Sequence, residues 1–182
     1  MNSLFLLLAL CQTPSYDDGT LLFVANGNHI VQSQTVSTLT HVGILFNEGE
    51  ELYFYEATPP VVKRTKFSEY VEELKKENKL PKHRKVPLLA WTVSPKVKMN
   101  EDQKKKMKVY LDAQLDKPYS IESYLFEEPG NGIHCCELVG DAWQFGGIKD
   151  TEKPYLDDPK SVWTKVKKDF KEPVELEIER KK

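Results

Sequence analysis

Short runs of apolar residues in the first half of the chain predict the strands of a sheet. Residues 20–24 form an apolar run between turn-forming segments, which is typical of a buried strand. Residues 40–46 and 51–57 are rich in β-branched and aromatic residues and flank a polar loop of four residues that contains glycine. They therefore predict a β-hairpin. Residues 86–93 form another apolar run and predict a further strand.

Apolar residues at helical spacing predict the helices. Residues 67–78 have one apolar face and one face of Glu and Lys residues, as an amphipathic helix does. Asn100 and Gln103 have the spacing of a capping box, so a helix is expected to begin there. Residues 28–39 and 162–170 carry weaker patterns and predict shorter helices.

A glycine-containing loop at residues 130–132 places a cysteine at the start of a helix. The loop cannot continue as a regular element, and an apolar run with helical spacing follows Cys135 at once. Unpaired backbone N–H groups and the helix dipole favour an anion at a helix N-terminus, so a thiol there loses its proton more readily. A thiolate is a nucleophile, whereas most free cysteines are small buried hydrophobes. From spacing alone both interpretations stay open.

The predicted hairpin brings a histidine and a carboxylate together. If Phe46 pairs with Glu51, antiparallel pairing places His41 opposite Glu56. A carboxylate beside an imidazole fixes its tautomer and stabilises its charged form, which is the orienting role in a catalytic triad. A slip of one residue in the register would separate the two side chains.

Composition favours one ordinary globular domain, expected over residues 17–182. The chain has 182 residues, of which 40% are hydrophobic and 30% charged. The formal net charge is −2, and basic residues are interspersed with acidic ones. No nucleic-acid partner is therefore expected.

Residues 1–16 are expected to be a signal peptide or lipoprotein leader. Residues 4–10 are all apolar, a run too short to span a bilayer but long enough for the apolar part of a signal peptide. Leu10 lacks the small side chain usual before a cleavage site. The prediction is export to the periplasm or cell envelope, with membrane anchoring through Cys11 if that residue is acylated; a buried first strand is the alternative.

The three cysteines predict separate thiols without a metal. Cys135 and Cys136 are neighbours, which bridge only with strain, and Cys11 lies far away in the leader. The chain has no CxxC pair and no His/Cys set at zinc spacing, so neither a metal site nor a cofactor is expected.

Several short motifs follow one another along the chain in a fixed order. They are Asp18-Gly19-Thr20-Leu21-Leu22-Phe23, Thr40-His41-Val42-Gly43-Ile44, Tyr55-Glu56-Ala57, Pro60-Val61-Val62, Lys117-Pro118-Tyr119 and His134-Cys135-Cys136-Glu137-Leu138-Val139. In this order they resemble the circularly permuted NlpC-type, papain-like cysteine hydrolases of the YiiX/YebB-like group. The resemblance implies an α+β fold in which an antiparallel sheet packs against the helix that bears the cysteine. It further implies Cys135 as nucleophile, His41 as general base and Glu56 as the orienting residue.

The sequence departs from the family pattern next to the nucleophile. Members usually have Tyr-Cys-Ser-Glu-Leu there, so His134 replaces the tyrosine and Cys136 replaces the serine. These two residues and Tyr119 are the candidate substrate-binding residues. On a helix Cys135 shares the inner face with the apolar residues, while Cys136 lies about 100° round, which favours Cys135 as nucleophile.

The resemblance implies hydrolysis of an amide bond, in a cell-wall peptide or a related acyl substrate, through an acyl-enzyme. Three alternatives remain: hydrolysis of a lipid amide or ester, acyl transfer, and a binding protein on the same fold without catalysis. The apolar aromatic segment at residues 119–126 would suit an acyl chain.

Overall fold

The computed structural model describes residues 15–79, 86–128 and 130–178. The leader expected at residues 1–16 lies almost wholly outside these ranges. Within them, one antiparallel sheet is flanked by helices, which confirms the expected α+β fold. None of the helices in these ranges has the length and apolar character needed to cross a membrane.

Over the described residues the sheet has six strands in the order β4-β3-β2-β1-β5-β6, and each pair of neighbours is antiparallel. All six residues of the central strand β1 are buried, because helices cover both faces of the sheet. The strands are β1 (Thr20–Ala25), β2 (Leu39–Glu48), β3 (Glu51–Thr58), β4 (Val61–Lys66), β5 (Leu89–Val93) and β6 (Val174–Glu175).

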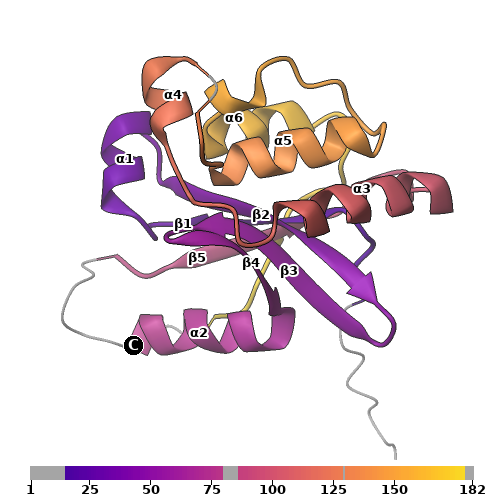
Figure 1. The fold of residues 1–182 in the computed structure, drawn as a ribbon. Coiled ribbons are helices and arrows are strands. Elements are labelled where there is room, and N and C mark those ends of the chain that lie inside the picture. The colour runs from indigo at the N-terminus through magenta and orange to yellow at the C-terminus, as the bar shows by residue number, and fades with distance from the viewer. Residues whose placement is uncertain (1–14, 80–85, 129, 179–182) are drawn as a thin grey trace, which may run out of the picture.

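The helices divide between the two faces and one end of the sheet (Figure 1). α5 and α6 lie over one face, and α2 lies under the other. α1 and α4 stand at the end where α5 begins. The helices are α1 (His29–Thr35), α2 (Phe67–Lys79), α3 (Glu101–Gln114), α4 (Glu122–Phe126), α5 (Cys135–Phe145) and α6 (Pro159–Val166), with a short 3-10 helix at Pro154–Leu156.

Two hydrophobic cores form because apolar side chains emerge on both faces of the sheet. The first, called the α5-side core, packs sheet residues against α5. The second, the α2-side core, packs the opposite face against α2. The α5-side core includes Phe23, Ile44, Tyr55, Cys135, Leu138 and Trp143. The α2-side core includes Leu22, Leu45, Phe54, Tyr70 and Leu74.

The hairpin forms as expected, but its predicted register is wrong. Phe46 pairs with Tyr53 rather than with Glu51, so the strands are shifted by two residues. The turn is correspondingly tighter, because Glu48 already pairs with Glu51. Since side chains alternate between faces with a period of two, a shift of two returns every side chain to its expected face.

The helix predicted over residues 28–39 is shorter than expected. α1 ends at Thr35, because Val36 adopts a left-handed backbone conformation with φ of 49° and is 87% exposed. The chain then enters β2 at Leu39.

Other element ends also differ from prediction. The strand predicted over residues 86–93 begins only at Leu89, since Val86 is solvent-exposed. The capping box predicted at Asn100 is confirmed, with the Gln103 N–H donating to the Asn100 side chain at 2.9 Å. α6 begins before residue 162, because Asp158 caps it with a proline at the first helical position.

Candidate active site

Cys135 is the first residue of α5, as the sequence predicted. His134 precedes it in extended conformation, and its side chain caps none of the helix N–H groups. The free N–H groups of the first turn are therefore available to an anion. Cys135 is buried, with 6% of its surface exposed.

A close approach of two chain segments holds the start of α5 in place. Ile133 pairs with Tyr119, and its N–H donates to the Pro118 carbonyl at 3.0 Å. A Cβ at Gly132 would lie 2.5 Å from the Ser120 Cβ and 2.8 Å from the Pro118 oxygen. Glycine is needed at position 132 because a side chain has no room there.

His41 and Glu56 form the contact that the sequence predicted, although the register differs. The His41 Nε2 lies 2.7 Å from the Glu56 Oε2. The observed register makes them diagonal neighbours on one face, and a diagonal pair of long side chains still touches. The Lys63 Nζ lies 3.2 Å from the other carboxylate oxygen of Glu56. Glu56 is therefore a buried carboxylate between two cations.

The ring of His41 is positioned by a neighbouring aromatic side chain. It meets Phe54 edge-on, with ring centroids 6.3 Å apart. Phe54 can occupy this position because residue 43 is glycine; a Cβ there would lie 2.5 Å from the Phe54 ring. The histidine thus contacts the α2-side core, while the cysteine belongs to the α5-side core.

The side chains of Cys135 and His41 interact directly at the end of the sheet. Burial disfavours the charged imidazole, but Cys135 and Glu56 outweigh burial and raise the pKa of His41 to about 10. The pKa of Cys135 lies far below its usual value, and the hydrogen bond from Cys136 is the largest cause. Interactions with His134 and His41 lower this pKa further, whereas burial acts in the opposite direction. The geometry therefore favours a thiolate paired with an imidazolium.

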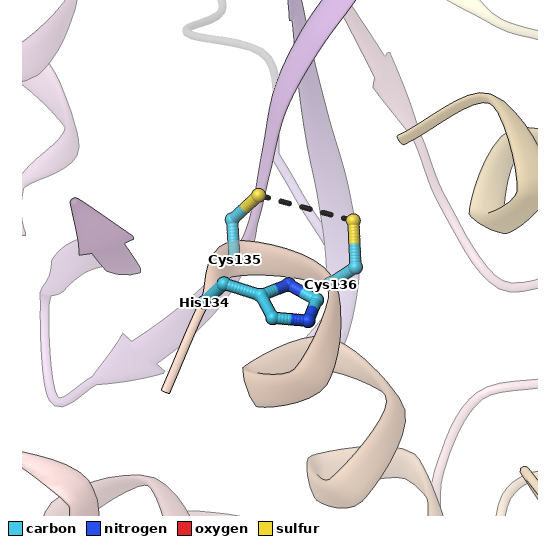
Figure 2. A group of neighbouring side chains, drawn as sticks. All are labelled: His134, Cys135 and Cys136. Atoms are coloured by element: carbon cyan, nitrogen blue, oxygen red, sulfur yellow. Dashed lines mark hydrogen bonds between the residues drawn. The ribbon is translucent and has the colours of Figure 1, made fainter. Parts of the chain in front are cut away.

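Cys136 is buried and contacts Cys135, although helical geometry placed it about 100° away from Cys135 around the helix. Its Sγ lies 3.8 Å from the Cys135 Sγ, and the residue is buried like its neighbour (Figure 2). Burial and the adjacent thiolate raise the pKa of Cys136 well above its usual value. One thiol keeps its proton and can share it with the other.

His134 is buried behind the two cysteines. Its Nε2 donates to the Tyr155 carbonyl at 2.9 Å, which assigns the proton to that nitrogen. Burial alone would lower the pKa of His134, but the interactions with Cys135 raise it overall. The ring of His134 is therefore a second imidazole, besides that of His41, that stabilises the thiolate of Cys135.

The imidazole of His134 and the two thiols could hold a metal ion. Their three ligand atoms lie within 4.8 Å of one another, at the start of α5 (Figure 2). Nitrogen and sulfur ligands suit soft cations such as Zn²⁺. Sequence reasoning expected no metal because three consecutive residues do not match a familiar zinc spacing.

Two cavities adjoin the reactive groups. The cysteine-side cavity is an open hollow of about 420 Å³, a volume that includes solvent space at its mouth, and it is lined by Val31, Tyr119, Ile121, Tyr124, Leu125 and Pro159 around Cys135. The histidine-side cavity is an open hollow of about 780 Å³, again with solvent space included, and it is lined by Thr40, Lys63, Tyr70 and Glu73 around His41 and Glu56. Tyr119 lines both, so this predicted binding residue lies where the cavities meet.

Sequence reasoning missed Lys63, although a signal for it was available. A tight turn at residues 59–60 would pair Thr58 with Val61 and hence Glu56 with Lys63, as the structure does. The Tyr155 carbonyl that holds His134 had no such signal, because it comes from a loop distant in sequence.

Comparisons with known proteins support the fold. No family model matches the sequence, and no curated protein matches it. Among solved structures, the chain is similar to the metalloprotein yiiX from Escherichia coli O157:H7, with a TM-score of 0.58 and 16% identity. The match covers 91% of this chain and 99% of that one. The chain therefore has a YiiX-like α+β fold, with a Cys/His cluster at the start of α5.

Proposed function

We propose that the protein is a cysteine hydrolase that cleaves an amide bond through Cys135, His41 and Glu56. The observation that carries this proposal is the chain of contacts from the Glu56 carboxylate through the His41 ring to a thiol at a helix N-terminus. Nucleophile, base and orienting group stand in the order that a catalytic triad requires.

The reaction begins with the thiolate of Cys135 attacking the substrate carbonyl. The backbone N–H of Cys135 helps hold the oxyanion of the tetrahedral intermediate. His41 then gives its proton to the leaving amine, which leaves an acyl group on the sulfur. Next, His41 takes a proton from water, and the hydroxide releases the acid. Glu56 keeps the imidazole oriented in both steps.

The assignment to the circularly permuted NlpC-type, papain-like hydrolases belongs to this proposal. It is supported by the chain order of His41 before Cys135 and by the YiiX-like fold. A small cell-wall peptide or a related acyl compound is the proposed substrate, and export to the cell envelope, with anchoring through Cys11, is the proposed location. Lipid amide or ester hydrolysis, acyl transfer and ligand binding without catalysis are the alternatives.

Metal binding is a second candidate function, favoured by the three ligand atoms of His134, Cys135 and Cys136. The YiiX structure is described as a metalloprotein, which agrees with this candidate. Cadmium bound by thiolates has a charge-transfer band in the ultraviolet, so titrating the reduced protein with Cd²⁺ tests metal binding. A saturable band at one equivalent supports a metal site, and no band refutes it.

The experiment that tests the hydrolase is the pH dependence of alkylation at each cysteine, read by peptide mass spectrometry in a chelating buffer. We expect Cys135 to react fast below neutral pH, where an ordinary thiol is mostly protonated, and to slow in His41→Ala. Cys136→Ser is the matched control, because it removes the second alkylation site from this helix but keeps a hydroxyl that can donate to Cys135. If Cys135 titrates as a free thiol does in the wild type, catalysis is refuted and the binding protein takes its place.

A further inference from the structure

Cys136 is a buried thiol that the proposed reaction uses only as a hydrogen-bond partner. Its Sγ lies 3.8 Å from the Cys135 Sγ, and 1% of its surface is exposed. A serine hydroxyl, which the hydrolases that the chain resembles usually have at this position, could donate such a hydrogen bond equally well. A second sulfur adds one capacity that a hydroxyl lacks, because it can form a covalent bond to an oxidised cysteine.

A small oxidant can reach both sulfurs. Cys135 and Cys136 each line the cysteine-side cavity, which is open to solvent. Hydrogen peroxide is little larger than water and can enter it. A cysteine oxidised to a sulfenic acid either condenses with a nearby thiol or is oxidised further to a sulfinic acid, which thiols do not restore. The contact between the two sulfurs favours condensation.

A bridge between neighbouring residues is strained, and the start of α5 can accommodate it. Consecutive Cα atoms lie about 3.8 Å apart, closer than the roughly 4.4–6.8 Å usual between bridged cysteines. The first bond of the helix runs from the Leu138 N–H to the His134 carbonyl at 3.0 Å, so the N–H of the peptide between the two cysteines has no partner within α5. That peptide can therefore rotate without losing a helical bond from its N–H. The strain that remains makes the bridge easy to reduce, as a reversible modification requires.

From this arrangement we propose that Cys135 and Cys136 form a reversible disulfide when hydrogen peroxide oxidises Cys135, with Cys136 as the resolving thiol. The disulfide removes the nucleophile from the active site and protects it from irreversible oxidation. The loss of activity rests on the proposed hydrolase, whereas the disulfide itself needs only the two thiols.

The proposed steps balance in atoms and electrons. First, the Cys135 thiolate attacks one oxygen of the peroxide, the S–O bond forms as the O–O bond breaks, and the hydroxide that leaves takes a proton from solvent. The sulfur is thereby oxidised and the peroxide reduced. Next, the Cys136 sulfur attacks the Cys135 sulfur, the S–S bond forms, the S–O bond breaks, and hydroxide leaves with the Cys136 proton as water. An external dithiol returns both cysteines to thiols and is itself oxidised to a disulfide.

The test is peptide mass spectrometry of the reduced full chain after treatment with hydrogen peroxide, in a chelating buffer that keeps metal ions off the thiols. Both cysteines stay on one peptide, which we expect to lose two hydrogens and to regain them fully after dithiothreitol. In Cys136→Ser the sulfenic acid of Cys135 has no resolving thiol, so dimedone should trap it there and not in the wild type.

Three results with the wild type overturn the proposal. The first is a peptide that gains oxygen at Cys135 without losing hydrogens. The second is a peptide that the peroxide leaves unchanged. The third is a bridge from either cysteine to Cys11 or to a second chain in place of the bridge between neighbours.

A second measurement separates the proposal from the function on which its consequence rests. 4-Nitrophenyl acetate acylates a reactive thiol directly, so the acyl-enzyme is followed by mass before oxidation, after oxidation and after dithiothreitol. We expect acylation of Cys135 to be lost on oxidation and fully recovered in the wild type, and to be recovered only in part in Cys136→Ser. An acyl-enzyme without a disulfide overturns the proposal and leaves the hydrolase standing. A disulfide in a protein that forms no acyl-enzyme refutes the hydrolase and leaves the modification standing.

Discussion

Replacing Glu56 with glutamine should lower the pKa of His41. In the wild type, the Glu56 Oε2 lies 2.7 Å from the His41 Nε2. A hydrogen bond between two charged groups contributes about 1.5–3 kcal/mol, and 1.36 kcal/mol corresponds to one pKa unit. Losing the charge should therefore bring the pKa of His41 from about 10 to about 8 or 9.

The pKa of His41 falls in this variant because the carboxylate stabilises the charged form of the imidazole. Glu56 stabilises the imidazolium, so its neutral substitute releases the proton at lower pH. The raised pKa of His41 stabilises the folded protein, and this contribution is fully present at pH values below the pKa of the histidine in the unfolded chain. It is lost as the pH rises through the pKa of the histidine in the folded protein. In Glu56→Gln this loss should begin at the same pH but be complete at lower pH, because only the pKa of the folded histidine changes.

The assay is an NMR titration of the histidine ring protons, with the His41 signal assigned by its absence in His41→Ala. Glu73→Gln is the control, because Glu73 lines the same cavity without bonding to His41. If Glu56→Gln leaves the pKa of His41 unchanged, or if Glu73→Gln lowers it equally, the carboxylate does not orient this base and the triad argument fails.

Three further predictions concern the start of α5. Cys136→Ala should slow alkylation of Cys135 at pH 6, because it removes the hydrogen bond that makes the largest contribution to lowering the pKa of that thiol; an unchanged rate would contradict this. Gly132→Ala should destabilise the fold by about 1–3 kcal/mol in thermal denaturation, since the new Cβ would clash with the Ser120 side chain at 2.5 Å. Gly130→Ala is the control with ordinary contacts, and equal melting temperatures would disprove the steric argument. His134→Ala should weaken Cd²⁺ binding in the ultraviolet titration, and unchanged affinity would exclude the imidazole as a ligand.

The sequence predicted the main elements because their patterns are local. The capping box at Asn100 and the glycine loop before Cys135 each act within a few residues, so they can be recognised without knowing the fold. The end of α1 could not be predicted, because Val36 takes a left-handed conformation that its side chain does not favour.

The contact between His41 and Glu56 was predicted through a register that is wrong by two residues. The two side chains still meet because the alternation of side chains between faces tolerates an even shift, whereas an odd shift would separate them. Hairpin registers depend on the geometry of the turn, and the polar residues at the tip of this one do not specify it.

The surroundings of the thiol could not be predicted from spacing. Helical geometry placed Cys136 away from the inner face, yet both thiols are buried and in contact. At the first turn of a helix, a side chain can be buried by neighbouring loops even when it does not lie on the face that packs against the core. The loop around Tyr155 and the start of α6 close this side, and both come from residues more than 15 positions further along the chain.

The reactive pair joins two separately packed layers of the protein. Cys135 is held by the packing of α5 on one face of the sheet, and His41 by the Phe54 ring on the opposite face. Loosening either layer moves one partner away from the other, so a partly unfolded chain carries only an ordinary, weakly nucleophilic thiol. In the proposed hydrolase, the reactivity of Cys135 therefore requires both layers of the domain to be packed.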